Sequence, residues 1–312
     1  MKNNVQLILL VVFAVFVAAC GGGATESSGK LKVVTTTGQL GDAVANIGGD
    51  TLELASLLGP GIDPHLYVPT EGDVGKFSSA DVIFYNGINL EAQMSRIMAQ
   101  MGERGKIVVS VGDSMPESDL LNWEGEGKAF DPHIWNDPVL WSQGVELIRD
   151  MLMEADPDNA DVYEANTKAY LAEIAETHAY VTELINSIPE SQRVMITAHD
   201  AFAYFGRTYG LEVAGLQGIS TESEAGTADV QNLAAFIIER GVPAMFVETS
   251  VPARTIEAVQ AAVQAQGAAV EIGGSLFSDA LGEAGTAAAT YNGMLRHNAE
   301  TLTGALGGTV TE

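Results

Sequence analysis

The stretch PDNADVYEANTKAYLAEIAETHAYVTELINSIP, residues 157–189, sets the architecture of this chain. Pro157 stands near its start, where a proline suits the first turn of a helix, and Pro189 closes the run. Between them apolar residues such as Ile174 and Val181 recur at helical spacing, so we predict one continuous helix. At a rise of 1.5 Å per residue it is about 45 Å long, enough to run the length of a two-domain protein.

On both sides of this helix, short β-type runs alternate with helix-like runs. The β-type runs before it are KLKVVTTT (30–37), TLELASLL (51–58), ADVIFYNG (80–87) and KIVVSVGD (106–113). Those after it are RVMITAHD (193–200), LEVAGLQGI (211–219), AMFVETSV (244–251) and AAVEIGG (268–274). Such alternation predicts parallel sheets covered by helices on both faces. The predicted fold class is therefore α/β, with two parallel-sheet lobes joined by one long backbone helix.

The N-terminal residues read as an export signal. MKNNVQLILLVVFAVFVAAC has one Lys and an apolar run that is too short to span a bilayer comfortably, so residues 1–19 are predicted to be a signal peptide. Cys20 follows small residues as in the bacterial lipobox, which predicts a lipid anchor on that cysteine. Residues 20–30 are rich in Gly and Ser and are predicted to form a flexible linker.

The rest of the chain is long enough for two domains. We place an N-terminal α/β lobe at residues 31–156, the connecting helix at 157–188 and a C-terminal α/β lobe at 189–312. Cys20 is the only cysteine, so no intramolecular disulfide can form.

Acidic residues outnumber basic ones by 41 to 15, which gives a formal net charge of −26. Lys and Arg form no cluster, so nucleic acid is not expected as a partner. A strongly acidic surface raises the local concentration of cations. Solubility alone explains this charge equally well.

Three of the five histidines follow β-type segments, where ligands bind in open α/β sheets. They are His65, His133 and His199. The first two share the tripeptide Asp-Pro-His, in which the proline stiffens the loop and Asp63 or Asp131 can accept a hydrogen bond. Metal-binding histidines usually need such an acceptor to fix their tautomer. This pattern predicts a metal site, with both aspartates supporting the ligands.

A fourth ligand is required, and two carboxylates qualify. Asp279 in GGSLFSDALGEAG and Glu248 in MFVETS each follow a strand, and spacing alone does not choose between them. The remaining histidines, His178 and His297, are interpreted as packing residues on helices. Three tryptophans flank the second Asp-Pro-His segment and are predicted to pack on or shield the site: Trp123, Trp135 and Trp141.

Several segments together resemble the zinc and manganese solute-binding proteins of ABC importers, the ZnuA/TroA type. The similar segments are DPHLYVPT (63–70), DPHIWNDP (131–138), TAHDAFAYFGRTYGL (197–211), SLFSDALG (275–282), GISTESEAGTADV (218–230) and AMFVETSV (244–251). The resemblance runs from Leu31 to the C-terminus. It implies a metal in the interlobe cleft, with His65 and His133 from the first lobe and His199 and Asp279 from the second. It therefore favours Asp279 over Glu248.

The resemblance also implies partners and a location. The chain would be a monomer anchored to the membrane through lipid on Cys20, on the extracytoplasmic side. It would deliver its metal to an ABC transporter permease that works with a cytoplasmic ATPase. Closure of the lobes on the metal would be the state that the permease reads.

Zinc is the expected cargo, with manganese as the alternative. Three imidazoles and one carboxylate suit zinc, whereas manganese prefers more oxygen. Manganese-type members of the family commonly have Glu where this chain has His199. Many zinc-type members carry a His-rich loop before the second ligand, but residues 114–130 contain acids and no His. If the histidines have ordinary pKa values, metal affinity should decrease as the pH drops below about 6.5.

Three other functions make different demands on these residues. A zinc metallohydrolase would keep a coordination position open for water beside a separate general base. A surface adhesin is compatible with a metal-binding lipoprotein. A siderophore or vitamin binder would need an aromatic pocket and has no use for paired Asp-Pro-His loops. The chain contains no P-loop, nucleophile elbow or GxGxxG after a strand, so we expect a binding protein and not an enzyme.

Overall fold

A computed structural model describes residues 29–123 and 129–310, and from Leu31 onward the chain forms one compact unit. The predicted signal peptide and Cys20 lie outside the described residues, as does most of the predicted linker. Within the described ranges, no helix is both long and apolar enough to cross a membrane.

The first lobe is built on a parallel four-stranded sheet. Its strands are β1 (Leu31–Thr35), β2 (Leu52–Ser56), β3 (Val82–Tyr85) and β4 (Ile107–Ser110), in the order β2-β1-β3-β4. Its helices are α1 (Gly38–Gly48), α2 (Glu71–Ser79) and α3 (Ser95–Glu103). β-branched residues fill β1, and side chains on its two faces alternate between different cores: Val33 faces one and Val34 the other.

The second lobe repeats this strand order. Its strands are β7 (Val194–His199), β8 (Glu212–Gln217), β9 (Ala244–Glu248) and β10 (Glu271–Leu276). β7 pairs with β8 and β9 with β10, all parallel, and β7 lies beside β9. Its helices are α6 (Ala203–Tyr209), α7 (Thr227–Arg240), α8 (Arg254–Ala265) and α9 (Tyr291–Ala305). In each lobe the first strand is central and the second lies at one edge, so the two lobes are pseudo-symmetric in strand order.

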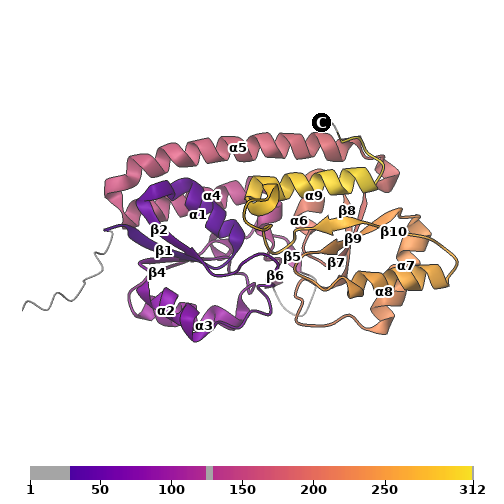
Figure 1. Ribbon diagram of the computed structural model, residues 1–312, viewed down its shortest axis with the longest axis horizontal. Coiled ribbons are helices and arrows are strands. Elements are labelled where there is room, and N and C mark those ends of the chain that lie inside the picture. The colour runs from indigo at the N-terminus through magenta and orange to yellow at the C-terminus, as the bar shows by residue number, and fades with distance from the viewer. Residues whose placement is uncertain (1–28, 124–128, 311–312) are drawn as a thin grey trace, which may run out of the picture. The chain divides into compact units, whose positions relative to one another are not determined.

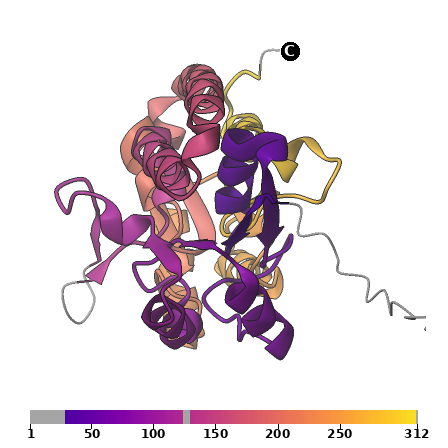
Figure 2. The same ribbon diagram turned by 90° about the vertical axis from the view of Figure 1, so that its left-hand side faces the viewer.

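The predicted long helix is present as α5 (Ala160–Ser187), after a turn of 3-10 helix at Pro157–Asn159. It packs on α1 and on α4 (Pro138–Ala155) of the first lobe and on α9 of the second. Figure 1 shows α5 running along both lobes, and Figure 2 shows it outside α4. This confirms the predicted fold class, two parallel-sheet lobes joined by one long helix.

The Asp42 carboxylate links helices α1, α5 and α9 where the two lobes meet. Asp42 on α1 accepts hydrogen bonds from the Tyr170 hydroxyl on α5 at 2.8 Å and from the Tyr291 N–H on α9 at 3.1 Å. Burial raises the pKa of Asp42, although both hydrogen bonds oppose that shift. Beneath these helices, one hydrophobic core contains side chains of both lobes, such as Val33 and Met195.

One helix and one pair of short strands were not predicted from the sequence. Helix α2 contains two glycines and little apolar periodicity, but it starts at a capping box in which Thr70 and Asp73 satisfy each other's backbone N–H groups. The other is a short antiparallel pair, β5 (Asn122–Trp123) and β6 (Ala129–Phe130).

Candidate metal site

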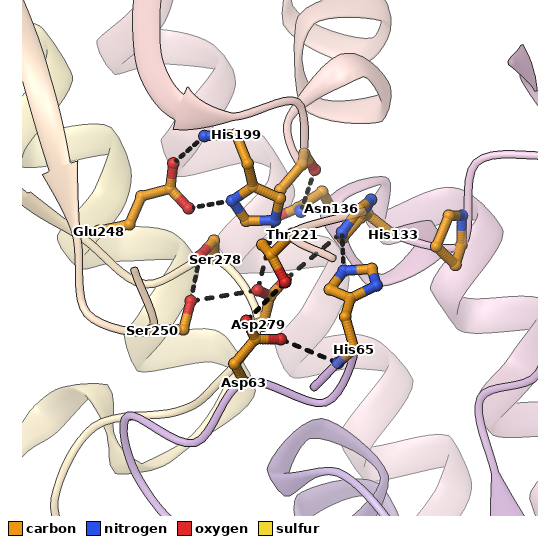
Figure 3. A network of polar contacts seen from close by, with 12 residues as sticks. Asp63, His65, His133, Asn136, His199, Thr221, Glu248, Ser250, Ser278 and Asp279 are labelled. Atoms are coloured by element: carbon orange, nitrogen blue, oxygen red, sulfur yellow. Dashed lines mark hydrogen bonds and ion pairs between the residues drawn. The ribbon is translucent and has the colours of Figure 1, made fainter. Parts of the chain in front are cut away.

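The four predicted residues meet in one buried cluster. His65, His133, His199 and Asp279 each place one ligand-type atom within 4.8 Å of the others, and all four side chains are buried. Figure 3 shows the three rings and the carboxylate pointing toward one another. The Nε2 atoms of His65 and His133 are 3.3 Å apart.

His65 comes from the loop that follows β2. Asp63 accepts the backbone N–H of His65 at 2.8 Å, and its other oxygen accepts the Thr221 hydroxyl of the second lobe at 2.6 Å. Asp63 thus supports the loop and not the ring, which differs from the predicted tautomer-fixing role. Farther along, Asp73 holds the end of the loop because it accepts the Tyr67 hydroxyl at 2.6 Å.

His133 lies in the connection between β6 and α4. Oδ1 of Asp131 is 2.7 Å from Nδ1 of its ring, which directs Nε2 toward the cluster as predicted from the Asp-Pro-His motif. The Asn86 amide donates to the Pro132 carbonyl at 2.9 Å and so fixes the backbone just before the histidine. Trp135 packs edge-on against the His133 ring, with centroids 5.3 Å apart, and its indole N–H donates to the Ser278 carbonyl of the second lobe.

His199 is the last residue of β7, as expected for a ligand at a strand end. Its Nδ1 lies 2.5 Å from Oε2 of Glu248, and its backbone N–H donates to Oε1 of the same carboxylate at 2.9 Å. Glu248, one of the two carboxylates that spacing left open, therefore stands behind His199 and supports it. The sequence did not reveal this role, although the position of Glu248 at the end of the adjacent strand β9 was the available signal.

Asp279 follows β10 in a loop that is held by the side chains of Ser250 and Asn298. The Ser250 hydroxyl lies 3.1 Å from Oδ2 of Asp279 and 2.9 Å from the Ser278 hydroxyl. The Asn298 amide on α9 pairs with both backbone polar groups of Phe277. The carboxylate faces two rings, with Oδ1 3.4 Å from Nε2 of His133 and Oδ2 3.3 Å from Nε2 of His199.

The protonation of the cluster differs from residue to residue. Burial lowers the pKa of His65 to about 3, so this ring is neutral near pH 7. Burial opposes charge on His133 as well, but the nearby Asp131 and Asp279 carboxylates raise its pKa to about 9. For His199, Glu248 and Asp279 outweigh burial and raise the pKa well above its usual value. The two rings in turn hold the pKa of Asp279 well below its usual range, against its own burial.

The separations between these atoms suit a small cation. Ligands at about 2.05 Å from a tetrahedral ion lie about 3.3 Å from one another. Three contacts within the cluster, His65–His133, His133–Asp279 and His199–Asp279, are 3.3, 3.4 and 3.3 Å, and all four ligand atoms lie within 4.8 Å of one another. Nε2 of His199 and Oδ1 of Asp279 are buried, and their nearest polar contacts are with other members of the cluster, so a metal ion at its centre could bond to both.

The other predicted residues lie outside the cluster. His178 is half-buried on α5 with its Nδ1 3.0 Å from the Tyr209 hydroxyl, and His297 is 3.0 Å from the Ser275 carbonyl. Both fit the prediction that they are packing residues. Trp141 packs on Tyr291 with centroids 5.5 Å apart, whereas Trp123 is exposed, so Trp135 is the predicted tryptophan that touches the site.

Comparison with known proteins places this fold among two-lobed extracytoplasmic binding proteins. Residues 33–305 match the family described as zinc-uptake complex component A, periplasmic. The chain belongs to this family, which confirms the resemblance seen in the sequence.

Individual relatives cover nearly the whole chain. It is 46% identical to the zinc-binding protein TroA of Treponema pallidum, over 93% of this chain and 94% of that protein. It is 44% identical to the manganese-binding lipoprotein MntA of Bacillus subtilis, over 96% of this chain and 98% of that protein. Comparison with the solved structure of TroA from Treponema pallidum gives a TM-score of 0.87, and the alignment covers 89% of this chain and 99% of the TroA chain.

Proposed function

We propose that this protein binds a divalent transition metal outside the cytoplasm and delivers it to the permease of an ABC importer. His65, His133, His199 and Asp279 would hold the metal. The observation that carries the proposal is the convergence of four buried donor side chains, two from each lobe. Because a metal joined to both lobes adds binding energy only to their closed arrangement, occupancy would favour a shape that the permease can recognise.

Zinc is the metal that we propose. In support, three imidazole nitrogens and one carboxylate form the donor set that zinc prefers. Manganese is the second candidate, since both oxygens of Asp279 face ring nitrogens and one relative is described as manganese-binding. A carboxylate that gives both oxygens would raise the coordination number toward that preferred by manganese.

We propose transport and not hydrolysis. Catalytic zinc sites keep a position open for water beside a free general base. In this cluster four side chains supply donors, and two neighbouring acids, Asp131 and Glu248, are engaged by His133 and His199. Both carboxylates therefore support metal ligands, and neither is placed as a free base that could activate water.

The remaining assignments are part of the same proposal. Residues 1–19 would be the signal peptide, Cys20 the lipid anchor and residues 20–30 the linker. The lobes would span 31–156 and 189–312 on either side of the connecting helix at 157–188, and the protein would act as a monomer. The relatives described as lipoproteins support the anchor.

Metal analysis of protein purified without chelator tests this function directly. We expect about one zinc per chain, and competition should show zinc preferred over manganese. The His199→Ala variant should lose affinity by orders of magnitude because it removes one ligand. The matched control is His178→Ala, which removes a half-buried imidazole outside the cluster and should retain metal. Undiminished zinc in His199→Ala would remove this residue from the site.

A further inference from the structure

The two oxygens of the Asp279 carboxylate have different surroundings. Oδ1 is buried with Nε2 of His133 3.4 Å away, and within the described ranges it accepts no hydrogen bond from outside the cluster. Oδ2 lies 3.3 Å from Nε2 of His199 and also accepts the Ser250 hydroxyl at 3.1 Å (Figure 3). One oxygen is therefore left to a metal ion alone, whereas the other is shared with a hydroxyl donor.

Ser250 donates its hydroxyl proton to Asp279. A carboxylate that binds a metal ion is ionised and can only accept hydrogen bonds, and a serine hydroxyl has a single proton to donate. The Ser250 and Ser278 hydroxyl oxygens lie 2.9 Å apart, and either could donate in that contact. Since the proton of Ser250 is directed to the carboxylate, Ser278 is the donor. The two hydroxyls thus form a one-way chain from Ser278 through Ser250 to Oδ2 of Asp279.

The position of Ser250 is fixed by the end of strand β9. The Thr249 N–H donates to the carbonyl of Leu276 at 3.0 Å, which extends the pairing of β9 with β10 by one residue. Glu248 is the last residue of β9 and contacts His199, and Ser250 follows two residues later. One short segment, residues 248–250, therefore supports both metal ligands of the second lobe.

The hydrogen bond to Oδ2 affects how the carboxylate can bind a cation. The hydroxyl draws negative charge from this oxygen and fixes the orientation of the carboxylate, so Oδ1 is the oxygen left to bond closely to the ion. Oδ1 and one nitrogen from each of His65, His133 and His199 then make four donors, the number that zinc takes in a closed tetrahedral site. Manganese prefers more oxygen ligands, and Oδ2 would be a further one if the hydroxyl released it.

We propose that Ser250 is a specificity-determining residue: its hydroxyl holds Oδ2 back from the ion, so that Asp279 binds through one oxygen and the site prefers zinc to manganese. This inference rests on the proposed metal-binding function and names a residue that sets the choice of metal. Ser250 itself does not bind the ion, because it acts through Asp279.

The first test compares zinc and manganese affinities of purified variants by chelator competition. Ser250→Ala removes the hydroxyl, and the ratio of zinc to manganese affinity should fall by about tenfold. Ser250→Thr keeps a hydroxyl, and its added methyl group borders a cavity of about 520 Å³, so it should keep the ratio of the unaltered protein. The matched control is Ser142→Ala on α4, which removes another half-buried hydroxyl, one that donates to the Pro138 carbonyl at 2.7 Å.

The second test reads the number of ligands directly. Cobalt(II) is bound in place of zinc, because its visible absorption is strong in four-coordinate sites and weak in sites with more ligands. We expect strong bands for the unaltered protein and for Ser250→Thr. The bands of Ser250→Ala should be weaker, because both oxygens of Asp279 can then reach the ion.

The outcomes separate this inference from the proposed function. In Ser250→Ala, either an unchanged ratio of zinc to manganese affinity or an unchanged cobalt spectrum would overturn the proposed role of Ser250 and leave the transport function intact. An equal loss of both metals is such an unchanged ratio and would make Ser250 a support of Asp279 without effect on selectivity. Failure of the unaltered protein to bind either metal would overturn both proposals.

Discussion

Zinc binding should release more than one proton near pH 7.5. The pKa of His133 is about 9, so this ring is protonated in the metal-free protein at this pH, and Glu248 and Asp279 raise the pKa of His199 in the same direction. His65, with a pKa of about 3, is already neutral. Zinc requires neutral imidazoles, so it must displace the protons on His133 and His199.

The size of the effect follows from this count. Each proton displaced per zinc makes the apparent affinity change by about 10-fold per pH unit, or about 1.4 kcal/mol, and displacement of a proton from both rings makes it approach about 100-fold. Ordinary histidine pKa values would instead confine the loss of affinity to pH below about 6.5. The carboxylates around the rings therefore move the expected window upward, so that affinity already falls as the pH drops from 8.5 to 6.5.

Titration calorimetry in buffers of different ionisation enthalpy measures the protons released. The Glu248→Gln variant is the control, because it removes the carboxylate that raises the pKa of His199 and should reduce the release toward one proton. Chelator competition at pH 6.5 and 7.5 gives the affinity ratio independently. A release near zero for the unaltered protein, with affinity constant over this range, would refute the assignment of charge to the two rings.

Three further outcomes are expected. Asn86→Ala removes the amide that holds the Pro132 carbonyl, and zinc affinity measured by chelator competition should fall about 10-fold; no change would show that the loop positions His133 without it. Trp135→Phe leaves the Ser278 carbonyl unpaired, and denaturant unfolding should show a loss of about 1–3 kcal/mol. For the metal-free protein, the pKa of His133 is about 9 when folded and near 6.5 when unfolded, so its protonation stabilises the fold below pH 6.5 and that contribution is lost as the pH rises through 9. Denaturation at pH 6.5 and 9.5 should show a loss of at least about 3 kcal/mol, because the raised pKa of His199 contributes in the same direction, and an unchanged free energy of unfolding would contradict the raised pKa of His133.

The sequence was sufficient for most of the fold because its local signals agree with the tertiary structure. The helical spacing of Ile174 and Val181 predicted α5, and β-branched runs predicted the strands of both lobes. Helix α2 was missed because its stability comes from the capping box of Thr70 and Asp73 and not from an apolar stripe.

Contacts of the site could be predicted where the two residues that make them lie close together in the sequence. The Asp131–His133 contact joins residues two apart, so the Asp-Pro-His motif revealed it. The contacts of Glu248 with His199 and of Thr221 with Asp63 join residues 49 and 158 apart, and only the packing of β9 beside β7 and of one lobe against the other creates them. Asp63 shows the limit of motif reasoning, because in both tripeptides the aspartate accepts the backbone N–H of its histidine, but only Asp131 also contacts the ring.

The hydrophobic core beneath α5 has a consequence for folding. Met195 and Phe246 of the second lobe share it with Val33 and Leu40 of the first. Neither lobe can unfold without exposing apolar surface of the other, so heat should melt residues 31–310 in one cooperative transition. A lobe produced alone would leave that surface bare and would aggregate. The two lobes repeat one strand order, but the cooperative unit of folding in this protein is the pair of lobes.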